Sequence, residues 1–203
     1  MTSTAAVSAD VAIPSMGLAE RVGQFADVMA TIQITGNDGA ARDVHRAMGE
    51  ILAVLKSLRS RGGSLYVLGN GGSAAVASHA VTDFVNVGRL RATTVHDPSI
   101  LTCMANDYGY ENAYARMLSV LARPGDALIA ISSSGRSPNI ANAVKTFRGI
   151  GGIAITLSGF ARDNPLRGLG EHNVWLDATD YGFVEIGHQF ILHNLADRLR
   201  LDV

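Results

Sequence analysis

The feature that most constrains the fold is a unit that recurs from residue 64 onward: a short apolar or β-branched run, a loop of small residues, and a segment with helical spacing of its apolar positions. The apolar runs are SLYVLG (64–69), ATTVHD (92–97), DALIAISSS (126–134), GGIAITLSG (151–159) and HNVWLDA (172–178). Helical spacing is found at 73–87, 98–104, 111–122, 138–149 and 183–201. Strands that alternate with helices form a parallel sheet covered on both faces. The sequence therefore predicts an α/β fold with a five-stranded parallel sheet.

Two further helices are expected before this pattern begins. Residues 17–35 and 39–60 have apolar residues at helical spacing, and the turn-like GNDG (36–39) separates them. Residues 1–15 lack the basic start and apolar core of a secretory signal, which favours a cytoplasmic protein. We expect these residues to form a flexible tail. A length of 203 residues then predicts a single domain over residues 16–203.

Composition excludes several classes of function. Apolar residues make up 47% of the chain and charged residues 17%, which is typical of a globular protein. A net charge of −1 gives no basic face for nucleic acid, and no apolar run has the length of a membrane span. Cys103, the only cysteine, excludes an intramolecular disulfide and is expected to be buried. We therefore expect a cytoplasmic protein with no nucleic-acid or membrane partner.

The glycine-rich loop after the first strand is a candidate anion site. Gly69–Ala74 matches the pattern G-x-G-x-x-A, in which glycines let backbone N–H groups approach an anion at a helix N-terminus. A dinucleotide site also needs an acidic residue about 20 positions on. The sequence there reads GRLR (88–91), and Asp97 lies too far along. A Lys-Ser/Thr pair is also missing after the glycines, so no nucleotide cofactor is expected.

A second loop, ISSSGRSPN (131–139), follows another apolar strand. It offers four hydroxyl groups and a glycine, and Pro138 suits the first turn of a helix. Several hydroxyl donors at a helix N-terminus suit a small phosphomonoester, although a serine-rich turn with one helix cap is the alternative. Both loops fall at carboxyl ends of strands, where open α/β sheets bind ligands. That coincidence favours the phosphate site.

Three segments together resemble a known family: GNGGSAA with His79 shortly after it, ANDYGYENAYARML (105–118) and RPGDALIAISSSGRSPN (123–139). They are similar to the sugar isomerase (SIS) domain, and within it to the phosphoheptose isomerases, from about residue 20 to the end. Those enzymes interconvert sedoheptulose 7-phosphate and glycero-manno-heptose 7-phosphate. The resemblance implies a flavodoxin-like three-layer sandwich and a homotetramer with its active sites at subunit interfaces.

The resemblance also implies residue roles. The sugar phosphate would be bound by residues of both loops and of the ANDYG segment: Asn70, Gly71, Ser73, Asp107, Ser132, Ser133, Ser134 and Ser137. A zinc ion would be bound by two pairs of residues on two helices: His79, Asp83, Glu185 and His193. Asp83 stands where the family usually has glutamate, and Glu185 stands where glutamine is usual.

Aldose–ketose isomerisation needs a base for the carbon-bound proton and an acid or a metal at the carbonyl oxygen. His79 and Asp83, at i and i+4, share one helix face, a spacing that surface hydrogen-bonded pairs also have. Glu185 and His193 are eight residues apart and lie on one side of the last helix. We expect Glu185 or Asp83 to be the base and His193 the acid, with His79 as a metal ligand or an orienting group and His188 as the second choice for the acid. Two histidines and two carboxylates also suit tetrahedral zinc.

The expected activity is therefore that of an intramolecular oxidoreductase. It would convert sedoheptulose 7-phosphate to D-glycero-D-manno-heptose 7-phosphate through an enediol, at the entry to nucleotide-activated heptose biosynthesis. The alternative is a non-catalytic SIS module that binds a sugar phosphate as a regulatory signal or bridges proteins, as the DnaA-binding relatives do. The presence of acid, base and metal candidates favours the enzyme.

Overall fold

The computed structural model describes residues 17–201, and the tail expected at residues 1–15 lies outside that range. The sheet has the order β2-β1-β7-β6-β5-β3-β4. Its strands are β1 (Gln33–Thr35), β2 (Ala41–Arg42), β3 (Ser64–Leu68), β4 (Arg91–Thr93), β5 (Ala127–Ile131), β6 (Ile153–Ser158) and β7 (His172–Trp175). The five strands β3 to β7 are parallel to one another, as predicted.

Two strands were not predicted. The expected helix over 17–35 ends early, as α1 (Leu18–Ala30), and β1 follows it and pairs antiparallel with β7. Strand β2 occupies the beginning of the expected helix over 39–60, and α2 (Val44–Ser60) begins after Asp43, whose side chain caps it. The sheet therefore has seven strands instead of five, because two antiparallel strands extend it beyond β7.

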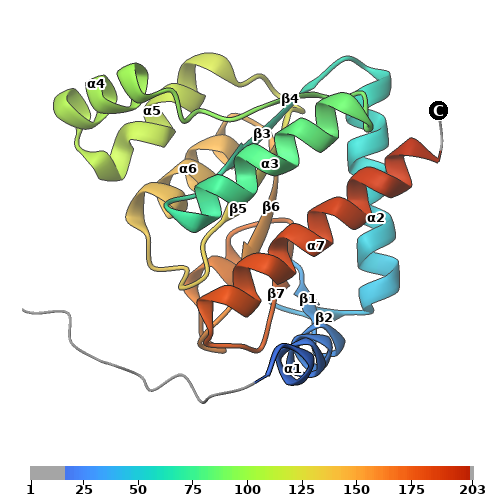
Figure 1. Cartoon of the computed structure of the whole chain (residues 1–203). Helices are drawn as coiled ribbons and strands as arrows, with labels where there is room; N and C mark the ends of the chain where they lie inside the picture. Colours follow the sequence, from blue (N-terminus) through green and yellow to red (C-terminus); the bar gives the residue numbers. More distant parts are fainter. Residues whose placement is uncertain (1–16, 202–203) are drawn as a thin grey trace, which may run out of the picture.

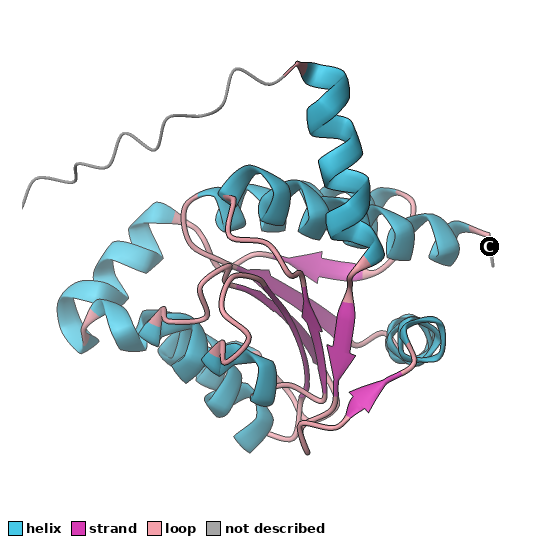
Figure 2. Ribbon diagram, turned by 90° about the horizontal axis from the view of Figure 1, so that it is seen from below, coloured by secondary structure: helices cyan, strands magenta, loops and turns pink. Residues whose placement is uncertain are grey.

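The remaining helices are α3 (Gly72–Asn86), α4 (Pro98–Tyr108), α5 (Tyr110–Leu121), α6 (Pro138–Gly149) and α7 (Tyr181–Arg200), with a 3₁₀ turn at Pro165–Gly168. Helices lie on both faces of the sheet (Figures 1 and 2), which gives the expected three layers. Alternate residues of β3 explain this arrangement, since successive side chains of a strand point to opposite faces. Leu65 and Val67 pack in the core with α2, α3 and α7, whereas Tyr66 and Leu68 pack in the core with α5 and α6.

Strand order places the two candidate loops side by side. The chain runs from β3 to its neighbour β4 and then crosses to β5 on the other side of β3. The carboxyl ends of β3 and β5 therefore meet where the strand order reverses, which is the usual ligand position in such sheets. Within the described part of the chain, no helix is both long and apolar enough to span a membrane.

Candidate active site

The first loop turns sharply from β3 into α3, and two glycines allow the turn. A Cβ atom on Gly69 would lie 2.7 Å from the backbone and side chain of Ser73, so only glycine fits that close approach. Gly71 has φ +53°, a left-handed conformation that glycine adopts without strain. The turn aims the N-terminus of α3 at the space between the loops, where an anion is favoured.

The serine loop runs from the end of β5 to Pro138 at the first turn of α6. The backbone N–H of Ser132 donates to the carbonyl of Leu157 on β6 (3.0 Å), and the Ser132 and Ser137 hydroxyl groups lie 3.5 Å apart. The hydroxyl oxygen of Ser133 is buried and has no hydrogen-bond partner in the described chain. The loop therefore still has hydroxyl groups available to a ligand.

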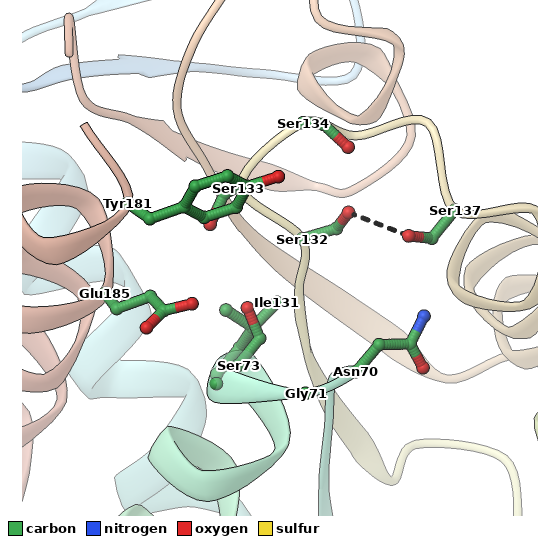
Figure 3. Close-up of a pocket in the computed structure, with 11 residues that line it drawn as sticks. Asn70, Gly71, Ser73, Ile131, Ser132, Ser133, Ser134, Ser137, Tyr181 and Glu185 are labelled. Atoms are coloured by element: carbon green, nitrogen blue, oxygen red, sulfur yellow. Dashed lines mark hydrogen bonds between the residues drawn. The ribbon is translucent and has the colours of Figure 1, made fainter. Parts of the chain in front are cut away.

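A cavity of about 260 Å³ lies between the two loops and the N-terminal part of α7 (Figure 3). Its lining residues come from both loops and from α7: Asn70, Gly71, Gly72, Ser73, Ile131, Ser132, Ser133, Ser134, Ser137, Tyr181 and Glu185. The structure thus brings together seven of the eight residues expected to contact the sugar phosphate. The eighth, Asp107, lies exposed on α4 and does not line this cavity; it accepts a hydrogen bond from Asn106 (2.9 Å).

Glu185 points from α7 toward the first loop (Figure 3). Its carboxylate covers the backbone of Gly72: a Cβ atom there would lie 2.5 Å from the Glu185 carboxyl carbon and closer still to both oxygens. Gly72 is the first residue of α3, so the carboxylate lies at the positive end of that helix. This position gives the cavity one carboxylate beside its phosphate-type loops.

A group of three possible metal ligands lies farther along the same two helices. His79 and Asp83 of α3 and His193 of α7 offer ligand atoms that are all within 4.8 Å of one another. Asp83 Oδ2 lies 2.9 Å from His193 Nδ1 and 3.6 Å from His79 Nε2. Glu185, the fourth expected ligand, is not a member of this group among the described residues.

The chemistry of this group fits a metal ion. Asp83 Oδ2 is buried and makes no directed hydrogen bond, although the His193 ring nitrogen is only 2.9 Å away. A buried carboxylate oxygen without a hydrogen bond costs free energy unless a cation or another donor compensates it. Two imidazoles and a carboxylate are common ligands of zinc. These three side chains could therefore hold a divalent ion while leaving a position open.

The burial of His188 and of Cys103 bears on two further predictions. His188, the second choice for the acid, is fully buried in the core and contacts the carbonyl of Ser158 at 3.1 Å, and burial lowers its pKa to about 4. Neither His188 nor His193 lines the cavity, but His193 is partly exposed and lies beside Asp83, so it is the better candidate for the acid. Cys103 is exposed instead of buried, because it lies on α4, a helix none of whose residues is buried in the described chain.

Sequence reasoning missed three residues that line the cavity: Gly72, Ile131 and Tyr181. Gly72 and Ile131 lie within the two predicted loops, but neither was assigned a contact with the sugar phosphate, because neither has a polar side chain. Tyr181, the first residue of α7, is one turn before Glu185, and its i, i+4 spacing from Glu185 was the available signal.

Comparison with known families agrees with this geometry. The family model described as SIS domain matches residues 24–159, more than half of the chain, and the chain belongs to that family. The phosphoheptose isomerase of Pelobacter propionicus is 34% identical over 164 residues, which cover 77% of this chain and 86% of the relative. That of Geotalea daltonii is 32% identical over 169 residues, with 80% and 87% covered. Within the SIS family, the chain groups with the phosphoheptose isomerases.

A solved structure supports the fold. The phosphoheptose isomerase of Neisseria gonorrhoeae superposes with a TM-score of 0.74 at 24% identity, over 89% of this chain and 95% of that one. The predicted SIS fold is therefore confirmed.

Proposed function

We propose that this protein interconverts sedoheptulose 7-phosphate and D-glycero-D-manno-heptose 7-phosphate. The observation that carries the proposal is the position of Glu185, whose carboxylate lines a cavity formed by two phosphate-type loops. The naming of relatives at 34% and 32% identity as phosphoheptose isomerases supports the choice of a seven-carbon sugar.

The phosphate would bind between the loops. Ser132, Ser134 and Ser137 line the cavity and can donate hydrogen bonds to phosphate oxygens. The N-termini of α3 and α6 begin at Gly72 and Pro138, so two helix dipoles favour the negative charge. Phosphate held at this end would fix the sugar chain relative to α7.

Proton transfer would fall to side chains of α7 and α3. We assign the base to Glu185, which faces the cavity and can take the proton between the two reacting carbons. We assign the acid that serves the carbonyl oxygen to His193, which lies two turns beyond Glu185 on α7 with its Nδ1 2.9 Å from Asp83 Oδ2. This assignment chooses between the two carboxylates that the sequence left open.

As the alternative to an acid at the carbonyl oxygen, we propose that His79, Asp83 and His193 can hold a zinc ion, which would then take the place of His193 as the group that serves that oxygen. Bound zinc polarises a carbonyl oxygen and stabilises the charge that develops there. Glu185 lines the cavity and is not part of this group, so the proposed zinc site has three protein ligands.

We propose a homotetramer in the cytoplasm. Apolar side chains on α1 and α7 support self-association, since Leu18, Val22, Ile186 and Phe190 are each at least 57% exposed. The role of Asp107 beside the sugar hydroxyls and the extent of a single domain over 16–203 remain predictions.

The test is turnover of sedoheptulose 7-phosphate by the parent chain and by Glu185→Gln. General acid–base groups contribute about 10²- to 10⁴-fold, so kcat should fall by at least about 100-fold while the fold is kept. Glu20→Gln, at an exposed position of α1, is the matched control and should turn over like the parent. A parent that binds the sugar phosphate but never converts it would instead support the non-catalytic SIS module.

A further inference from the structure

Asn70, which lines the cavity, is held by a side chain that does not line it. Asn139 lies on the first turn of α6 and is only 2% exposed. The two carboxamides form a reciprocal pair: Asn70 Nδ2 donates to Asn139 Oδ1, and Asn139 Nδ2 donates to Asn70 Oδ1, both at 2.9 Å. This pair joins the glycine loop directly to the helix that follows the serine loop.

The backbone of α6 fixes the polarity of this pair. The N–H of Ile140 is shared between two acceptors, Asn139 Oδ1 at 3.0 Å and the carbonyl of Ser137 at 3.1 Å. A backbone N–H can only donate, so the atom that it contacts must be the oxygen of the Asn139 carboxamide. The nitrogen of Asn139 then faces the oxygen of Asn70, and the orientation of the Asn70 carboxamide is determined as well.

Tyrosines of α5 complete the arrangement. The Tyr110 hydroxyl contacts Asn70 Oδ1 at 3.0 Å, and the Tyr114 hydroxyl donates to the carbonyl of Gly69 at 3.2 Å. Because Asn70 Oδ1 also accepts from Asn139, Tyr110 and Asn139 together occupy both of its acceptor positions. Asn70 Nδ2 has two hydrogens, and the pair uses one of them.

We propose that Asn139 is a positioning residue. Its carboxamide is oriented by the backbone N–H of Ile140 and in turn orients the carboxamide of Asn70. Asn70 therefore presents one N–H donor, and no acceptor, to an oxygen of the phosphorylated sugar. This inference rests on the proposed function for the identity of the ligand. It also gives the ANDYGYEN segment a role at the site, through the Tyr110 hydroxyl. Asn139 does not line the cavity, and it affects ligand binding by fixing the position of the glycine loop relative to the serine loop.

The test compares Asn139→Leu, Asn70→Ala and the double variant. The dissociation constant for sedoheptulose 7-phosphate and the kinetic constants are measured for variants that melt above the assay temperature. A misplaced binding group costs up to about 10²-fold, so Asn139→Leu should lower kcat/KM by about 10- to 100-fold. Most of the loss should appear in KM, and the double variant should be within about threefold of Asn70→Ala, because both act through one donor.

Asn142→Ala is the matched control. Asn142 lies one turn farther along α6 and also ties it to α5, by donating to the carbonyl of Glu111 at 3.0 Å, but it does not touch the glycine loop. It should keep the parent's KM. If Asn139→Leu does not fold, Tyr110→Phe takes its place: loss of one hydrogen bond from this 49%-exposed side chain should raise KM by about two- to tenfold.

The proposal is overturned if Asn139→Leu keeps the parent's KM, if the losses of the two single variants multiply in the double variant, or if Tyr110→Phe matches the parent. Failure of the proposed function has a different signature. The parent chain itself would then not convert the sugar phosphate, and the dissociation constants would still report whether Asn139 and Asn70 act together.

Discussion

Replacing Gly72 by alanine should lower the activity of the protein and leave its stability nearly unchanged. A Cβ atom at Gly72 would lie 2.5 Å from the carboxyl carbon of Glu185, whereas side-chain carbons essentially never approach other atoms within 3.0 Å. The carboxylate must therefore retreat by at least about half an ångström from the place where it lines the cavity. If Glu185 is the base, that retreat displaces it from the reacting carbon.

The size of the effect follows from the geometry of proton transfer. A displacement near 1 Å costs up to about 10²-fold in rate, so a retreat of about half an ångström or more should lower kcat for Gly72→Ala by about tenfold or more. Stability should hardly change. Gly72 opens α3 with negative φ, alanine is favoured over glycine in helices by about 1 kcal/mol, and the displaced atoms end a flexible side chain. The free energy of unfolding should therefore stay within about 1 kcal/mol of the parent.

The assay pairs steady-state turnover of sedoheptulose 7-phosphate with denaturant unfolding. Gly49→Ala in α2 is the control, because a Cβ atom there meets nothing within 4 Å. It should stabilise the helix and leave turnover unchanged. If folded Gly72→Ala turns over the sugar phosphate within about threefold of the parent, the assignment of Glu185 as the base would be refuted.

Three further outcomes are expected. Asp83→Asn should lower the affinity for zinc by at least about tenfold, measured against a chelating dye, and an unchanged affinity would remove Asp83 from the metal group. Gly135→Ala should lower the free energy of unfolding by about 2 kcal/mol or more, because Gly135 has φ +65° and its Cβ would collide with Asn164; an unchanged urea midpoint would contradict this. Burial lowers the pKa of His188 to about 4, so the unfolded chain takes up the proton first as pH falls. Stability supplied by neutral His188 is complete above about pH 6.5 and is lost toward pH 4, and His188→Gln should flatten that slope in urea titrations.

Much of the fold followed from local pattern. The buried strands β3, β5 and β6 have continuous apolar sequences, and their helices have clear apolar stripes, so both were predictable. The missed strands β1 and β2 have three and two residues, and they exist because β1 pairs with β7, about 140 positions along the chain. Such pairing is a tertiary effect that no local pattern contains.

The two loops of the site could be predicted from the sequence, but the burial and pairing of individual side chains could not. The loops carry glycine and hydroxyl residues at strand ends, which is a signal of chemistry in the sequence itself. The distinction between Glu185 in the cavity and His188 in the core depends on which side of α7 meets the sheet, and both lie within one turn. The pairing of Asn70 with Asn139 joins positions 69 residues apart and could be found only in three dimensions.

The most direct test of the central claim, that Glu185 moves a carbon-bound proton of a bound sugar phosphate, is isotope transfer from deuterated water. The parent chain is incubated with sedoheptulose 7-phosphate in deuterated buffer, and the sugars are examined by mass spectrometry and NMR. The account predicts an aldose product that carries deuterium at carbon 2, and loss of both product and label in Glu185→Gln. A sugar phosphate that binds tightly yet gains no deuterium and yields no aldose would contradict it.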